Sequence, residues 1–378
     1  MIWPRGAISS GVASGIKKGG LDLGMLVFES PCAWAGTFTR NAAAAACVKW
    51  SRSLLTQRVR AVVVNSGNAN ACTGKRGPLA VEETTLTAAG LLSCSPEEVL
   101  VASTGPIGIP LPVEKLVGAM PAAVEALSRS TDSFSEAILT TDSAPKVAAS
   151  EAGGVSLVGV GKGAAMLAPD MATMLAFIVT DARVDGRSLH ESLRGAVNQT
   201  FNRISVDACE STNDSVFAIA TGTATPVSAG DFADALTHVC WDLAEQMARD
   251  AEGGTRLVRI RIGGAPDDST AATLGRAVAA SALWRAALHG SDPNWGRVLA
   301  ALGTVDRTLD LNDIEIRIGR ETVFECGEPS GSLTAAAEEL TRSDVAVSCR
   351  VGRGRGTAEL LSSDLSPDYV TLNSKGTT

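Results

Sequence analysis

One stretch of the sequence, residues 160–181, carries the side chains best suited to covalent chemistry. Lys162 lies in a glycine-rich turn, and residues 170–173 (DMAT) place the hydroxyl of Thr173 directly before the apolar run 174–179. If that run is a buried strand or helix, Thr173 is anchored on a rigid element while the residues before it form a strained loop. Because a threonine hydroxyl is a weak nucleophile without a base beside it, the stretch predicts a nucleophile that needs an activating partner.

The elements that must position this stretch read as a mixture of short strands and helices. Ser95-Pro96-Glu97-Glu98 has the pattern of a capping box with proline at the first helical position, so a short helix is expected there. Strands and helices do not alternate regularly as in βαβ units, so the sequence predicts α+β layers rather than a doubly wound parallel sheet. From their periodicity, the expected strands are 59–64, 155–160, 257–262 and 314–318, and the expected helices are 189–201, 232–248, 271–288 and 334–340.

Three familiar site patterns fail. A phosphate loop around Gly161-Lys162-Gly163 would need a glycine at Ser156 and a serine or threonine at Gly163. A dinucleotide fingerprint would need its last glycine at Ala164. No G-x-S-x-G nucleophile elbow occurs, although a Ser-His-Asp triad assembled from distant residues stays an open alternative.

Composition excludes several classes of protein. The formal net charge is −8 and basic residues are not clustered, which argues against a nucleic-acid partner. The eight cysteines form no C-x-x-C pair and the three histidines show no metal-ligand spacing, so we expect buried thiols and no metal. The sequence begins without a signal-peptide pattern, and no apolar run approaches the ~20 residues that cross a bilayer. We therefore expect a cytoplasmic protein without a membrane partner.

The stretch around Thr173 resembles the hallmark of the glutamate N-acetyltransferase (ornithine acetyltransferase) family, K-G-x-G-M-x-x-P-x-M-A-T-M-L. Further segments resemble the family in the same order and at compatible spacing. Each segment alone is a weak signal, but together they are a strong one. These segments are 11–17 (GVASGIK), 65–74 (NSGNANACTG), 103–108 (STGPIG), 140–142 (TTD), 200–203 (TFNR), 211–214 (STND), 252–255 (EGGT), 292–297 (DPNWGR) and 369–378.

The resemblance implies a precursor that cuts itself between Ala172 and Thr173. The fragments would be an alpha chain, 1–172, and a beta chain, 173–378, with a C-terminal subdomain from about 255 to 378. The implied fold is a layered α/β sandwich of the aminopeptidase/ornithine acetyltransferase type, N-terminal-nucleophile-like, with a smaller C-terminal α/β domain. Fragments that stay together share a core, and the family suggests that two such units associate as α2β2.

The implied reaction moves an acetyl group from N-acetylornithine to glutamate in the cyclic pathway of arginine biosynthesis. Cleavage frees the α-amino group of Thr173, whose reference pKa of about 7.7–8.0 suits it to take and return a proton. The hydroxyl of Thr173 first attacks the Ala172 carbonyl, and water hydrolyses the resulting ester. The same hydroxyl then accepts the acetyl group, and the glutamate amine collects it from acetyl-Thr173. No cofactor is required, and acetyl-CoA remains an alternative donor.

The resemblance also assigns the other site residues. Thr104 and Gly105 would form the oxyanion hole that both half-reactions need. Lys162 would contact the substrate carboxylate or tune the Thr173 amine, and Glu252 would pair with the ornithine amine. Asn373 and Thr378 enter the site only if the C-terminal tail folds back over it. The implied substrate-binding residues are Thr141, Lys162, Thr173, Glu252, Asn373 and Thr378.

Several positions depart from the family pattern. Residues 207–210 (DACE) stand where relatives usually have D-G-D-T, and Gly254 and Arg256 replace the usual alanine and lysine. Ala165 takes the place of a glycine, and the tail lacks the aromatic residue that often precedes its final pair. The nucleophile and the oxyanion pair are retained. The departures bear on substrate choice, since one pocket contact changes specificity by ~1–3 kcal/mol.

Other functions remain open. An N-terminal-nucleophile amidohydrolase or aminopeptidase would process itself in the same way but release the acyl group to water. A related acetyltransferase of secondary metabolism would use the same chemistry on other amino acids. An unprocessed homologue would serve as a binding or assembly protein and would run as one full-length band.

Overall fold

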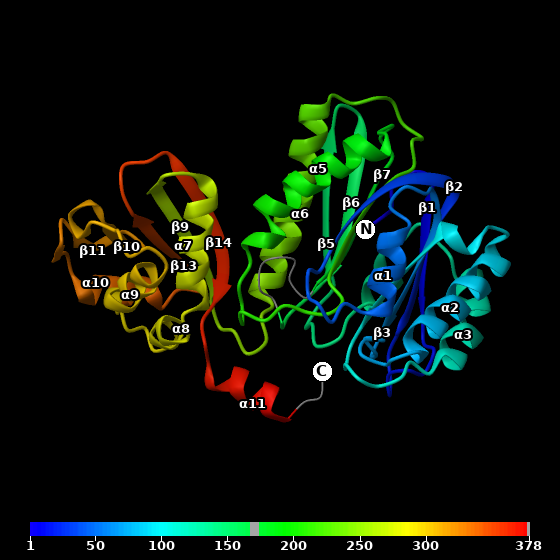
Figure 1. Ribbon diagram of the computed structural model, residues 1–378, viewed down its shortest axis with the longest axis horizontal. Coiled ribbons are helices and arrows are strands. Elements are labelled where there is room, and N and C mark those ends of the chain that lie inside the picture. Colours follow the sequence, from blue (N-terminus) through cyan, green and yellow to red (C-terminus); the bar gives the residue numbers. More distant parts are fainter. Residues whose placement is uncertain (167–173, 376–378) are drawn as a thin grey trace.

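The computed structural model describes residues 1–166 and 174–375, and two β-sheets organise these parts of the chain (Figure 1). The first sheet has eight strands in the order β4-β3-β2-β8-β7-β6-β5, with β1 paired to β2. Its strands are β1 (Ala7–Val12), β2 (Leu23–Phe38), β3 (Val59–Ser66), β4 (Val99–Thr104), β5 (Lys146–Ala152), β6 (Val155–Lys162), β7 (Leu175–Thr180) and β8 (Ser215–Ala220).

The long strand β2 belongs to two layers. Its residues 23–27 pair with β3 and its residues 33–38 pair with β8, with an irregular register between the two segments. The two halves of the sheet contribute side chains to one shared core, with Val64 from β3 packed in the same cluster as Val160 and Phe177 from β6 and β7. The sheet is therefore folded over into two layers that face each other.

Helices cover the outer side of each layer (Figure 1). Residues of α2 and α3 pack on the layer of β1, β3 and β4, and residues of α5 and α6 pack on the layer of β5 to β8. The order helix, sheet, sheet, helix confirms the predicted layered sandwich. The helices of this part are α1 (Ala46–Ser53), α2 (Arg76–Leu92), η1 (Pro96–Glu98), α3 (Val113–Glu125), α4 (Asp132–Ala137), α5 (Gly186–Gln199), η2 (Phe201–Arg203) and α6 (Ala229–Arg249).

The strand after the predicted nucleophile lies in the middle of these layers. Leu175 and Phe177 of β7 point into the core between the sheets, whereas Ala176 and Ile178 point into the core beneath α5 and α6. Successive residues of a strand face opposite sides, so a strand buried on both sides reads as a continuous apolar run. This confirms that the apolar run predicted from the sequence is a rigid, buried element.

The second sheet builds a smaller α/β unit with its own core, at the left of Figure 1. Its strand order is β12-β11-β10-β13-β9-β14, and only the pair of β9 and β13 is parallel. The elements are β9 (Leu257–Ala265), α7 (Asp268–Ala280), α8 (Ala282–His289), α9 (Trp295–Val305), η3 (Leu311–Asp313), β10 (Glu315–Ile318), β11 (Glu321–Glu325), β12 (Glu328–Pro329), α10 (Leu333–Leu340), β13 (Asp344–Arg350), β14 (Gly356–Ser363) and α11 (Pro367–Lys375).

The predicted elements are confirmed with one difference. The four predicted strands and the helices predicted at 189–201, 232–248 and 334–340 are present, and the capping box at Ser95 begins the single turn η1. The helix predicted at 271–288 is two helices. Ser281 has an extended backbone, and its side chain accepts a hydrogen bond from the amide of Trp284. This cap ends α7 and begins α8, although the helical spacing of the apolar residues continues from one helix into the next.

The cysteines only partly follow the sequence prediction. All eight are free thiols; Cys32, Cys47, Cys240 and Cys349 are buried as expected, and Cys94 is half-buried. The prediction of buried thiols is wrong for Cys72, Cys209 and Cys326, which are exposed. Two of these three have positive φ and the third follows such a residue, so they occupy surface turns.

The helices in residues 1–166 and 174–375 include none that is both long and apolar enough to span a membrane.

Candidate active site

Three loops that carry family-like motifs meet at one end of the sandwich. The amide of Asn68 donates to the carbonyl of Thr104 at 3.0 Å, and the amide of Ala69 donates to Pro106 at 3.1 Å. The side chain of Asn213 donates to the carbonyls of Ala69 and Ser103 at 2.7 and 2.8 Å. Segments 65–74, 103–108 and 211–214 thus form one hydrogen-bonded unit at the carboxyl ends of β3 and β4.

A cavity of about 210 Å³ opens beside this unit. It brings together five residues that the sequence singled out, from β4, β6 and three loops. Two further predicted residues, Ala172 and Thr173, lie outside the described residues, as does Thr378. The cavity is lined by Lys17, Gly67, Thr104, Gly105, Pro106, Thr140, Thr141, Lys162, Ala165, Met166 and Glu252.

The backbone at Gly105 has no room for a side chain. Its φ is +139°, and a Cβ would lie 2.4 Å from the amide nitrogen of Asn68 and 2.5 Å from the carbonyl carbon of Gly67. These are backbone atoms of the tightly bonded unit, so they cannot move aside. Glycine is required here for close approach of two backbones, which gives Thr104 and Gly105 a fixed orientation at the cavity wall.

Lys162, at the end of β6, supplies a buried cation. The residue is 4% exposed, and its ammonium donates to the hydroxyls of Thr140 at 2.7 Å and Thr104 at 3.3 Å. Burial lowers the pKa of Lys162, and the nearby carboxylate of Asp142, at 3.8 Å, opposes that shift. The ammonium is therefore held beside Thr104 by fixed oxygen atoms.

Asp142 neutralises two lysines beneath the cavity. Its side chain is fully buried, lies 2.7 Å from Lys146 and accepts the amide of Gly163 at 2.6 Å. Burial alone would raise the pKa of Asp142, but the ammonium groups of Lys162 and Lys146 lower it to about 2. Lys146 also pairs with Asp250 at 2.6 Å. Lys162, Asp142, Lys146 and Asp250 thus form a network of alternating charges that stabilises the ammonium of Lys162.

Glu252 contributes a carboxylate to the lining of the cavity. Its amide donates to the carbonyl of Ala164 at 2.9 Å, and its Oε2 accepts a hydrogen bond from the side chain of Asn373 at 3.2 Å. Its Oε1 is buried and has no hydrogen-bond partner among the described residues. Asn373 is not part of the cavity lining, so it contacts the site through Glu252 as the chain folds back in α11.

The fold-back of the C-terminal helix has a local cause. A Cβ at Gly253, which has φ of +66°, would lie 2.3 Å from the amide nitrogen of Tyr369. The hydroxyl of Ser366 donates to the carbonyl of Gly253 and accepts from the amide of Tyr369. The loop after Glu252 and the start of α11 are therefore packed backbone to backbone.

Two carboxyl groups to which the sequence assigned no role, the half-buried Asp207 and the buried Asp214, contact the residues on either side of 167–173. Asp207 accepts the amide of Met166, and Asp214 accepts the amide of Met174 at 3.0 Å. Burial raises the pKa of Asp207 and raises that of Asp214 well above its ordinary value. Asp214 belongs to the family-like segment 211–214 and Asp207 to the segment 207–210 that departs from the family pattern, but only the fold shows that they bind the two described ends of this stretch.

The departures from the family pattern fall at different distances from the cavity. Ala165 is part of the lining. Arg256 points away from it and donates to the carbonyl of Leu288 and the hydroxyl of Ser291. Gly254 packs against Ser363 and Ala251. Of these three substitutions, only that at Ala165 directly alters the cavity wall.

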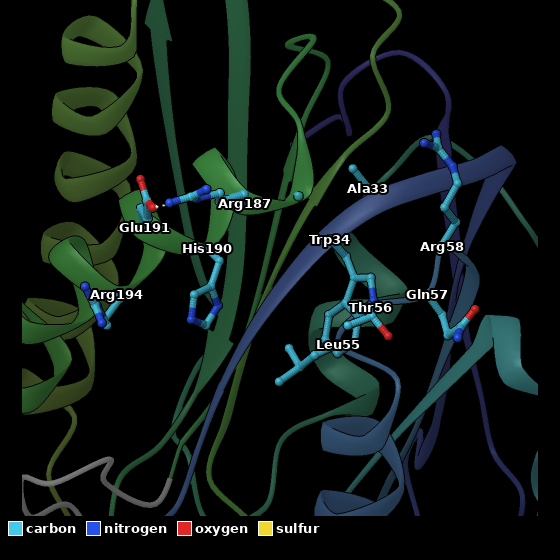
Figure 2. Close-up of a pocket in the computed structure, with 11 residues that line it drawn as sticks. Ala33, Trp34, Leu55, Thr56, Gln57, Arg58, Arg187, His190, Glu191 and Arg194 are labelled. Carbon is cyan, nitrogen blue, oxygen red and sulfur yellow. Dashed lines mark hydrogen bonds and ion pairs between the residues drawn. The ribbon is translucent and has the colours of Figure 1, made fainter.

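A larger cavity, of about 670 Å³, lies elsewhere, between α5 and the start of β3. In Figure 2, His190 and Arg194 on α5 face Leu55 and Thr56 across β2. It contains none of the predicted site residues. Its ion pair, Arg187 with Glu191 at 3.2 Å, is 89% and 60% exposed. The smaller cavity, in contrast, is lined by five of the predicted site residues, the buried Lys162 among them, so it is the candidate active site.

Comparisons with known proteins find relatives over nearly the whole chain. The model of the ArgJ family matches residues 8–378. The chain is 42% identical to the arginine biosynthesis bifunctional protein ArgJ of Thermus thermophilus, with 99% of each chain covered. It is 39% identical to a glutamate N-acetyltransferase of Methanopyrus kandleri, covering 96% of this chain and 97% of that one. It also resembles the crystal structure of arginine biosynthesis bifunctional protein argJ from Bacillus halodurans, with a TM-score of 0.51 and 36% identity over 53% of this chain and 98% of that chain.

Proposed function

The chain belongs to the ArgJ family, and from that premise we propose that it is an acetyltransferase of arginine biosynthesis that moves an acetyl group from N-acetylornithine to glutamate through Thr173. One observation carries the proposal. The cavity wall includes Lys162, whose partner across the sheet is Leu175, two residues after Thr173. The cavity combines the fixed Thr104–Gly105 corner with this buried lysine and with a buried oxygen of Glu252 that has no hydrogen-bond partner among the described residues. An N-acetylated α-amino acid with a carboxylate and a terminal amine matches that set of groups.

The first step of the proposal is self-cleavage. The Thr173 hydroxyl attacks the Ala172 carbonyl, and the carbon–nitrogen bond breaks as the hydroxyl proton reaches the nitrogen, which frees the amino group of Thr173 and leaves an ester. Water then hydrolyses the ester to the Ala172 carboxylate and restores the Thr173 hydroxyl. The Bacillus halodurans relative supports this step, because one of its chains is matched over 98% of its length by 53% of this chain. A fragment 173–378 would hold a similar share, 206 of 378 residues or about 54%.

Acetyl transfer then runs in two halves. The freed amine of Thr173 takes the hydroxyl proton as the oxygen attacks the acetyl carbonyl, and the proton passes to the departing ornithine nitrogen. The glutamate amine next attacks the acetyl-Thr173 ester and restores the hydroxyl. In both halves, Thr104 and Gly105 would stabilise the tetrahedral oxyanion, a contribution worth ~10²–10³ in rate for one donor.

Five other residues would form the rest of the substrate site. Lys162 would bind the α-carboxylate, since its ammonium lies against the oxyanion corner. Glu252 would bind the terminal amine of ornithine through its Oε1, which has no hydrogen-bond partner in residues 1–166 and 174–375. Thr141 lines the same cavity, and Asn373 would orient Glu252 through their hydrogen bond. Thr378 completes the site in this proposal.

The remaining features of the proposal concern the assembly and its substrates. The alpha and beta fragments would stay together and associate as α2β2 in the cytoplasm, acting on small molecules without a cofactor. Acetyl-CoA would serve as a second acetyl donor, in keeping with the bifunctional protein named in Thermus thermophilus.

Intact-mass analysis and a transfer assay test the proposal together. The purified protein should give two polypeptides, 1–172 and 173–378, and should acetylate glutamate from N-acetylornithine. The Thr173→Ala variant should stay one polypeptide and transfer nothing. Acetate release that does not depend on glutamate would instead identify an amidohydrolase, and an uncut wild-type chain without transfer would leave only a binding or assembly role.

A further inference from the structure

In the proposed reaction, one cavity binds two substrates whose side chains end in groups of opposite charge. Ornithine and glutamate share an α-amino group and an α-carboxylate, but the side chain of ornithine ends in an ammonium and that of glutamate in a carboxylate. The Oε1 of Glu252, which accepts no hydrogen bond from the part of the chain that the structure describes, suits the ammonium of ornithine. The carboxylate of glutamate requires a cationic donor, since burying an unpaired carboxylate is strongly unfavourable.

Two cations line the described part of the cavity, Lys17 and Lys162. Lys162 already contacts the hydroxyls of Thr140 and Thr104 and the carboxylate of Asp142. Lys17 donates to a single described acceptor, the carbonyl of Leu139 at 3.2 Å. An ammonium has three N–H donors, so the described contacts leave Lys17 with more capacity for a ligand.

The position of Lys17 is fixed by its surroundings. Its amide donates to the side chain of Asp22 at 2.9 Å, and the other oxygen of that carboxylate accepts the amide of Ser14. Asp22 is fully buried and its carbonyl accepts the amide of Ser66 at 2.9 Å. The loop of the GVASGIK segment is therefore tied to the end of β3.

The stem of Lys17 crosses the cavity wall at a glycine. Gly67 has φ of +89°, and a Cβ there would lie 2.6 Å from Cγ of Lys17. The absence of that atom lets the lysine stem lie against the backbone and brings its ammonium to the cavity. Burial lowers the pKa of Lys17 and the charge of Lys162 adds to that effect, whereas Asp22 and Asp142 oppose it. An incoming carboxylate would offset the repulsion between the two lysines.

We propose that Lys17 determines the choice of acyl acceptor, by binding the side-chain carboxylate of glutamate in the second half-reaction. This inference rests on the proposed acetyl transfer and adds a role for the GVASGIK segment. Glu252 and Lys17 then divide the two substrates between them: the carboxylate receives the terminal amine of the donor, and the ammonium receives the terminal carboxylate of the acceptor.

The test separates the two half-reactions in the processed enzyme. Lys17→Met keeps the apolar stem and removes the charge, and Lys18→Met is the matched control because Lys18 is exposed. Loss of one charged hydrogen bond should lower kcat/KM for glutamate about 10- to 100-fold. The rate of ornithine release in the first turnover, measured with N-acetylornithine alone, should change by less than about 3-fold in the same variant.

Acceptor choice gives a second readout that a merely structural role would not change. Wild type should prefer glutamate to glutamine, Lys17→Met should lose most of that preference, and Lys17→Arg should restore part of it. Equal losses for both acceptors, or an equal loss in the first turnover, would overturn the inference about Lys17 while leaving the acetyltransferase intact. Failure of the wild type and of Lys18→Met to transfer acetyl groups at all would instead contradict the proposed function.

Discussion

Of the two cavities compared above, the larger one has exposed charges and the smaller one has buried charges. The cavity between α5 and β3 is about three times larger, at about 670 Å³ against about 210 Å³, but its ion pair is mostly exposed. The smaller cavity holds a lysine that is 4% exposed, above a carboxylate that is fully buried. Because burying charge is costly unless it is paired, the concentration of buried charge locates chemistry better than volume does.

The largest expected effect is that of Gly105→Ala. The added methyl would collide with backbone atoms of Gly67 and Asn68 at 2.4–2.5 Å and displace the proposed oxyanion corner. Acetyl transfer should fall at least ~10²- to 10³-fold, measured as kcat with both substrates saturating.

Gly195→Ala, on α5 beside the larger cavity, is the matched control. A Cβ at that helical glycine meets nothing within 4 Å, so the variant should retain full activity and gain roughly 0.5–1 kcal/mol of stability. Comparable activity losses in both variants would remove the distinction between the two cavities.

Asp142→Asn should have the next largest effect, on the free energy of unfolding. The folded pKa of about 2 lies below the unfolded value, so ionised Asp142 stabilises the fold by about 2 kcal/mol above pH ~4. That contribution is lost as the pH falls through about 2. Urea unfolding should therefore show the variant clearly weaker than wild type at pH 7, with a difference that shrinks by pH 2.5.

A pH-independent difference between these two proteins would show that the carboxylate acts through packing and not through its charge. Lys162 would then depend on Thr140 and Thr104 alone for its position.

Asp214→Asn should act in the opposite direction. Burial raises the folded pKa of Asp214, so the wild-type fold loses stability as the pH rises above the unfolded value of about 3.9. The amide of Asn does not titrate and can still accept the Met174 amide through its oxygen. The stability of the variant relative to wild type should therefore rise as the pH is raised from about 4 to 8.

Chemical denaturation across that range provides the measurement. Asp234→Asn, at an exposed position on α6, is the control and should show no such trend. A falling relative stability of Asp214→Asn would mean that the wild-type carboxyl is ionised and favourable in the fold.

The sequence predicted the layers and most of the lining of the small cavity. The apolar run 174–179 indicated a buried element, a strand or a helix, and the fold makes it the strand β7. The family-like segments named Thr104, Gly105, Thr141, Lys162 and Glu252, which the fold brings to one place. The contacts of Asp207 and Asp214 with backbone amides could not be predicted, because they join segments distant in sequence. The break at Ser281 was missed because the serine cap leaves the helical period of apolar residues intact.

The smallest expected effect is that of Glu191→Gln in the larger cavity. The substitution removes the ion pair with Arg187, whose two side chains are 89% and 60% exposed. Exposed helix pairs at this spacing contribute ~0.3–0.5 kcal/mol, and salt screens them. Thermal unfolding at low and high salt should show a difference of that size that disappears with added salt, and acetyl transfer should stay within 2-fold of wild type on the order-of-magnitude scale of such contacts. A tenfold loss of transfer would instead couple the larger cavity to the reaction, because a solvated pair far from the lining of the small cavity has no other route to the chemistry.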